Sequence, residues 1–66
     1  MMEYTNSQIA AAIDEHIHSE RDRVILKRRF IDGLTFEALA EESDMSVRQI
    51  KRIVYKNTEK LIDSFR

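Results

Sequence analysis

The chain of 66 residues contains no proline and a single glycine, Gly33. Proline interrupts a helix and glycine weakens one, so a sequence that almost lacks both can be helical over most of its length. Apolar residues also recur at the spacing of one helix face, as Ile9, Ile13 and Ile17 do. The sequence therefore predicts an all-α fold.

Four segments begin with residues that can cap a helix, namely Thr5, Ser19, Thr35 and Ser46. Their side-chain oxygens can accept hydrogen bonds from the free N–H groups of a first helical turn. A glutamine stands three residues after Thr5 and another three residues after Ser46, which completes a capping box at both places. The expected helices cover residue 6 to residue 16 or beyond, 20 to the Asp32-Gly33 pair, 36 to about 42, and 47 to 65.

We expect one compact four-helix domain over residues 1–66, because no repeat, low-complexity stretch or linker divides the chain. A chain of this size buries about 60% of its unfolded surface, and it has no cysteine for a disulfide bond or a thiolate zinc site. Its stability must therefore come from packing. The predicted core consists of Ile13, Ile17, Ile25, Leu26, Phe30, Leu34, Leu39, Ala40, Met45, Val47, Ile50 and Val54.

Charge is segregated along the chain, although 11 Lys and Arg residues nearly balance 12 Asp and Glu residues. The net charge is −4 over residues 1–20 and again −4 over residues 34–45, whereas it is +3 over residues 21–33 and +4 over residues 46–66. A basic face can therefore coexist with a total charge of −1.

Residues 35–54 have the pattern of a helix-turn-helix, in which a short helix, a break and a longer recognition helix follow one another. The break covers residues 43–45. The small side chain of Ala40 allows the second helix to approach closely, and Met45 is expected to fill the corner between the helices. The long helix from residue 46 to residue 65 is the expected recognition helix.

The first turns of this helix carry three cations. Ile50 and Val54 are expected to face the core. Arg48, Lys51 and Arg52 then lie largely on the other faces of the helix. The helix dipole disfavours positive charge there by a few tenths to about 1 kcal/mol per residue, so the sequence accepts a local cost. Insertion of the helix into the major groove of DNA explains why the cations stand there, because their side chains then contact bases and phosphates.

The segment over residues 20–61 reads ERDRVILKRRFIDGLTFEALAEESDMSVRQIKRIVYKNTEKL. It combines a basic helix, an aromatic residue, a Gly-containing turn, Leu-Thr, an Ala-containing helix and a Ser-capped recognition helix. This pattern resembles region 4 of bacterial sigma factors, in both the housekeeping and the extracytoplasmic-function classes, without a gap. The segment departs from the family at Asp44, where many members have glycine.

In that family the recognition helix reads the −35 element of promoters, and the domain docks on the flap of RNA polymerase. The resemblance implies major-groove contacts by Val47, Arg48, Lys51 and Arg52, and positions near the DNA backbone for Thr35 and Arg29. Nothing in the chain corresponds to the sigma region that binds the core polymerase and melts the −10 element. The resemblance therefore implies a free-standing DNA-binding protein of the kind that phages and mobile elements often encode.

We expect sequence-specific binding of double-stranded DNA in transcriptional regulation, with RNA polymerase as a further candidate partner. Lys56 and Gln49 complete the predicted DNA-binding set, although Gln49 is primarily a capping residue.

One alternative function is that of a protein-interaction module that docks on RNA polymerase or another factor, which suits the acidic segments. Another is the DNA-binding part of a phage packaging protein. A solvated helix face is the alternative for Arg48, Lys51 and Arg52. For Arg28 and Arg29, a solvated face and phosphate contact are given equal weight.

No enzyme activity, cofactor or metal is expected, because the sequence shows no nucleophile with a base, no phosphate-binding glycine loop and no ligand set. His16 and His18 are two residues apart and point in different directions on a helix. The absence of a stretch of about 18 apolar residues favours a cytoplasmic chain without membrane contact.

The C-terminal apolar residues Leu61, Ile62 and Phe65 either fold back on the first helix or form a homodimer contact. Tyr55 is expected to pack at the edge of the core.

Overall fold

The computed structural model describes residues 4–65, which form four helices. They are α1 (Asn6–His16), α2 (Glu20–Phe30), α3 (Phe36–Ser43) and α4 (Val47–Ser64). No strand occurs within residues 4–65, and the molecule measures 32 × 20 × 19 Å along its principal axes. The prediction of a compact all-α fold with four helices is confirmed.

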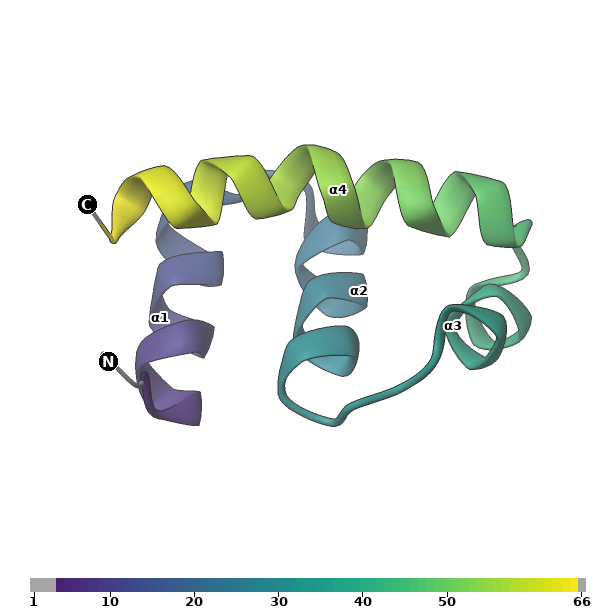
Figure 1. Cartoon of the computed structure of the whole chain (residues 1–66), viewed down its shortest axis with the longest axis horizontal. Coiled ribbons are helices and arrows are strands. Elements are labelled where there is room, and N and C mark those ends of the chain that lie inside the picture. Colours follow the sequence, from purple (N-terminus) through teal and green to yellow (C-terminus); the bar gives the residue numbers. More distant parts are fainter. Residues whose placement is uncertain (1–3, 66) are drawn as a thin grey trace.

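The longest helix, α4, forms one side of the molecule, and the other three helices pack against it (Figure 1). Helices α1 and α2 run in opposite directions on the inner side of α4, and α3 crosses the end of α4 that begins at Val47. Helix α2 also contacts both α1 and α3. Within residues 4–65, none of the helices combines the length and the apolar character needed to cross a lipid bilayer.

The four predicted caps set the starts of the four helices. The Thr5 hydroxyl accepts a hydrogen bond from the Gln8 backbone at 3.2 Å, and the Gln8 side chain accepts one from the Thr5 backbone at 2.9 Å. Ser46 and Gln49 form the same reciprocal pair at 3.1 and 2.9 Å. Ser19 and Thr35 each cap their helix with one hydrogen bond. Local capping rules therefore fix where each helix begins.

The core lies between α4 and the other three helices. Eight predicted members are buried, and they are Ile13, Ile17, Ile25, Leu26, Leu39, Ala40, Ile50 and Val54. Leu34, Met45 and Val47 are half-buried and pack against this cluster. The prediction missed three apolar members of the core, Ala12, Ile53 and Leu61.

The assignment of Phe30 to the core is wrong, because its side chain is 39% exposed. Phe30 is the last residue of α2, and it stands at the rim of a groove where no further element covers it. Helical spacing placed Phe30 on the same face as the buried Leu26, but at Phe30 that face borders the open groove between α1 and α4.

Two residues with left-handed backbone conformation shape the connections on either side of α3. Gly33 has a φ of 75°, and Asp44 has a φ of 55°. The Asp44 conformation ends α3 and lets the Met45 backbone N–H donate to the Ala40 carbonyl at 2.9 Å. Asp therefore occupies a conformation that glycine adopts at less steric cost.

Candidate nucleic-acid interface

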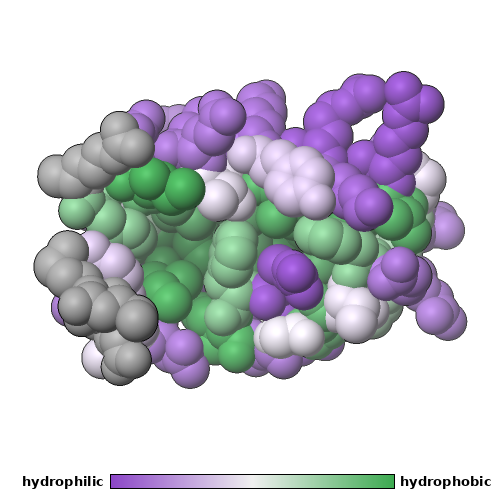
Figure 2. Space-filling model, viewed as in Figure 1, coloured by the Kyte–Doolittle hydropathy of each residue, from purple (hydrophilic) through white to green (hydrophobic). Residues whose placement is uncertain are grey.

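Four cations stand on α4 away from its buried stripe, and they are named here the basic ridge. The ridge consists of Arg48, Lys51, Arg52 and Lys56, all of which are exposed. Within residues 4–65, none of the four forms an ion pair. In Figure 2, hydrophilic side chains project beyond the half of α4 that starts at Val47.

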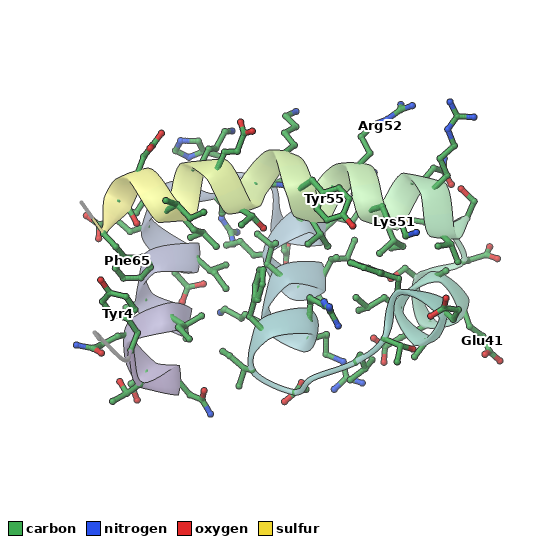
Figure 3. All side chains as sticks on the ribbon, viewed as in Figure 1. Tyr4, Glu41, Lys51, Arg52, Tyr55 and Phe65 are labelled. Atoms are coloured by element: carbon green, nitrogen blue, oxygen red, sulfur yellow. The ribbon has the colours of Figure 1, made fainter. Side chains whose placement is uncertain are left out.

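Buried side chains on the opposite face of α4 set the direction of the ridge. Ile50 is fully buried, and Val54 is only 3% exposed. The inward orientation predicted for these two residues is therefore confirmed. Figure 3 shows Arg52 extending away from the body of the molecule, whereas Lys51 lies on the side of α4 nearer to α3.

Asn57 also anchors α4, and sequence reasoning did not identify it. Its side chain is only 2% exposed, and its amide nitrogen donates to Asp22 at 3.2 Å and to the Ile53 carbonyl at 2.8 Å. Its spacing from Ile53 and Val54 places it on the buried stripe of α4. That spacing was the available signal, but asparagine is usually an exposed residue type.

The cations of α2 differ from those of the ridge, because each one contacts a carboxylate or a backbone carbonyl. The contacts are Arg21 with Asp22 at 3.1 Å, Lys27 with Asp14 at 2.7 Å, Arg28 with Asp32 at 2.9 Å and with Glu42, Arg23 with the Ile17 carbonyl at 2.9 Å, and Arg29 with the Leu34 carbonyl at 2.8 Å. Apart from Arg21, whose partner is its neighbour in the sequence, these residues join α2 to other helices or to the connections at its two ends.

Arg28 and Glu42 form the strongest of these links. The guanidinium donates two hydrogen bonds to the two carboxylate oxygens, at 3.0 and 2.5 Å. These hydrogen bonds lower the pKa of the Glu42 carboxyl and raise the pKa of Arg28 further above its already high value. Such a two-pronged pair restrains direction as well as distance, so it orients α3 relative to α2. The pairing of Arg28 with Glu42 and Asp32 was not among the alternatives considered for this residue, and its contact with phosphate stays a prediction.

Arg29 lies close to an aromatic ring of α3 that also neighbours the ridge. Its guanidinium carbon is 4.4 Å from the centre of the Phe36 ring, and the Lys51 ammonium is 5.7 Å from the same centre. The Tyr55 ring meets Phe36 edge to face, with 5.9 Å between the ring centres. Tyr55 therefore packs through one edge, as expected, although 58% of its surface remains exposed.

The remaining predicted site residues lie near the start of α3 and α4. Thr35 is exposed, and its hydroxyl accepts from the Ala38 backbone. The amide oxygen of Gln49 is engaged by Ser46, which agrees with its primary role as a cap. Val47 is half-buried against the core, so only part of its side chain faces outward.

A second surface feature lies at the opposite end of α4. A groove of about 250 Å³ is lined by Tyr4, Ile9, Phe30, Thr58, Leu61, Ile62 and Phe65. The Tyr4 ring stacks on Phe65 with 4.1 Å between the ring centres, and Leu61 is buried. The C-terminal residues thus fold back onto the N-terminal part of the chain, except that Ile62 is 49% exposed.

Within residues 4–65, no group of three or more His, Cys, Asp or Glu side chains is arranged to hold a metal ion. His16 lies 4.0 Å from the carboxylate of the neighbouring Glu15. Comparisons of the chain with protein families, curated proteins and solved structures find no match. The geometry of the chain itself is therefore the basis for assigning a function.

Proposed function

We propose that this protein binds double-stranded DNA in a sequence-specific manner and regulates transcription. In this proposal α3, the turn at residues 44–46 and α4 act as a helix-turn-helix, and the N-terminal half of α4 enters the major groove. A helix with its side chains is about 10–12 Å across, and the major groove is about 12 Å wide. The exposed position of the basic ridge on α4 supports this mode of binding.

One observation carries the proposal: the cations of α2 are engaged within the chain, whereas those of the ridge are not. The α2 cations contact carboxylates and carbonyl groups, so their charge contributes to folding. The ridge cations have no such partner within residues 4–65, and three of them stand in the first turns of α4, where the dipole disfavours positive charge. The unpaired cations of the ridge can bind a ligand with closely spaced negative charges. The phosphate backbone of DNA is such a ligand.

The regulatory part of the proposal rests on the resemblance to region 4 of sigma factors. The resemblance covers the basic helix, the Gly-containing turn and the Ser-capped helix, which here are α2, residues 31–35 and α4. RNA polymerase is the further partner that this resemblance suggests. The exposed acidic residues of α3, Glu37 and Glu41, leave a surface of opposite charge beside the ridge for such a contact.

The test measures binding of fluorescent duplex DNA by anisotropy, after duplexes that bind are selected from a pool of random sequences. The double variant R48A/K51A is compared with K60A, which removes a positive charge from an exposed position of α4 outside the ridge that forms no ion pair within residues 4–65. We expect R48A/K51A to weaken binding at least about tenfold, because each lost contact contributes about 1–3 kcal/mol. The control is expected to stay within about twofold of the wild-type chain, since a contact of that size is not lost.

Circular dichroism of each variant checks that the helices are intact. The proposal is contradicted if the wild-type chain selects no duplex from the pool. It is also contradicted if R48A/K51A binds as tightly as the wild-type chain, because the ridge would then not touch DNA.

A further inference from the structure

The groove at the C-terminal end of α4 has an apolar surface that the described residues leave open. Tyr4, Phe30 and Ile62 line it and are each more than a third exposed. The only hydroxyl-bearing side chain of α4 in the groove is Thr58, and it donates to the Val54 carbonyl at 2.6 Å. Figure 2 shows hydrophobic side chains around a hollow at the end of the molecule where α4 ends. An apolar surface of this kind is complementary to a copy of itself, because the contact buries no unpaired charge.

The groove lies on a side of α4 that is next to the side of the ridge. Ile62 follows Arg52 by ten residues, which at 3.6 residues per turn places the two side chains about a quarter of a turn apart. A two-fold axis that runs beside Ile62, parallel to the direction of Arg52, therefore brings two grooves together while both ridges point the same way. Two copies joined in this manner present their ridges to one face of the same duplex.

The distance along α4 between the ridge and the groove fits the repeat of DNA. Ile50 lies level with the first ridge residues and precedes Ile62 by twelve residues, which is about 18 Å along a helix. A two-fold axis at Ile62 then separates the two Ile50 positions by at most about 36 Å. Major grooves on one face of a duplex recur every 34–36 Å or so, about one helical turn. The position of the groove thus suits two copies on neighbouring sites.

The area of the patch indicates when such a pair forms. The exposed parts of Tyr4, Phe30 and Ile62 amount to about 200–300 Å² per copy, since each large side chain has about 150–250 Å² of surface. A stable interface buries about 800 Å² per partner. The contact is therefore too small to hold two free copies together. It suffices only where DNA already holds two copies at high effective concentration.

We propose that the groove binds the groove of a second copy of this chain when two copies occupy neighbouring sites on one face of DNA. The protein then binds inverted repeats cooperatively. This inference rests on the proposed function, in which the ridge meets DNA. A short duplex with one site binds one copy through the ridge and leaves the groove free.

The experiment measures the binding of the wild-type chain to three duplexes by electrophoretic mobility shift. The first duplex holds one selected site, and the second holds two sites as an inverted repeat with centres about 10 base pairs apart. The third has a spacing of about 15 base pairs, which turns the second site to the opposite face. We expect the second copy to bind at least about fivefold more tightly than the first on the 10-base-pair repeat only.

The variant I62E places two glutamates near the axis between the copies, and K60Q is its matched control. Both lower the net charge by one at an exposed position of α4, but Lys60 does not line the groove. We expect I62E and K60Q to bind the single site within about twofold of each other, because neither residue belongs to the ridge. I62E is expected to lose the tighter binding of the second copy, whereas K60Q keeps it.

The pairing of grooves is overturned if the wild-type chain fills the two sites independently, or with equal cooperativity at both spacings. Another occupant of the groove, such as a segment of RNA polymerase, gives the first of these results. The pairing is also overturned if I62E keeps the cooperativity. Failure of the wild-type chain to bind the single-site duplex is a different result, because it overturns the proposed function itself.

Discussion

Asn57 of α4 donates its side-chain amide to the carboxylate of Asp22 in the first turn of α2, with 3.2 Å between the two atoms. Asn57 is almost fully buried, and the Asp22 side chain is only 14% exposed. The pair lies beyond the basic ridge along α4 and joins that helix to the middle of the fold. It therefore fixes the rotation of α4, and with it the direction in which the ridge points.

Replacing Asn57 with alanine is expected to destabilise the fold by about 1–3 kcal/mol, because it opens a space and leaves Asp22 without this partner. The free energy of unfolding, measured by urea titration at neutral pH, checks this. Glu59→Ala on the exposed face of α4 is the matched control and should stay within about 0.5 kcal/mol of the wild-type chain. Equal stability of N57A and E59A would show that the pair does not secure α4.

The Arg28–Glu42 pair predicts a pH dependence. Contact with Arg28 lowers the pKa of Glu42 from its ordinary value of 4.5, so the folded state holds this proton less tightly than the unfolded state does. The resulting stability is present above pH 4.5 and is lost as the pH falls through the lowered pKa. We therefore expect Glu42→Gln to reduce the urea midpoint at neutral pH and to have a smaller effect at about pH 3.

Glu37→Gln is the control for this prediction, because Glu37 is exposed and forms no ion pair within residues 4–65. Its urea midpoint should follow that of the wild-type chain at both pH values. A constant difference between E42Q and the wild-type chain across the pH range would mean that Glu42 contributes through packing rather than through its charge.

The left-handed conformation of Asp44 predicts a contrast between two substitutions. Glycine adopts a φ of 55° without a steric penalty, whereas alanine does not. We expect D44G to be more stable than D44A by about 1–2 kcal/mol in thermal unfolding. Both variants remove the same charge, so the difference isolates the backbone. If the two variants melt together, this turn does not depend on the left-handed conformation.

The helix starts could be predicted because they depend on residues close together in the sequence. Thr5 with Gln8, and Ser46 with Gln49, form their hydrogen bonds within one turn. Phe30, by contrast, could not be placed from α2 alone, because its exposure depends on where the neighbouring helices end. The burial of Asn57 depends on Asp22, 35 residues away.

The candidate site could be predicted only in part, because some of its features depend on residues close together in the sequence and others depend on distant ones. The phase of α4 relative to Ile50 and Val54 was enough to place the four ridge cations away from the buried stripe of the helix. The sequence did not distinguish free cations from engaged ones, because the partners of α2 come from other elements. Arg28 meets Glu42, which is 14 residues away, and Lys27 meets Asp14 of α1.

The central claim is that α4 meets DNA through the ridge and through the adjoining ends of α2 and α3. Titration of the ¹⁵N-labelled chain with a selected duplex, followed by NMR, tests it directly. We expect the chemical shift changes to be confined to residues 46–56 and 28–35. Changes centred instead on the groove beside Tyr4 and Phe65, or no changes at all, would contradict the claim.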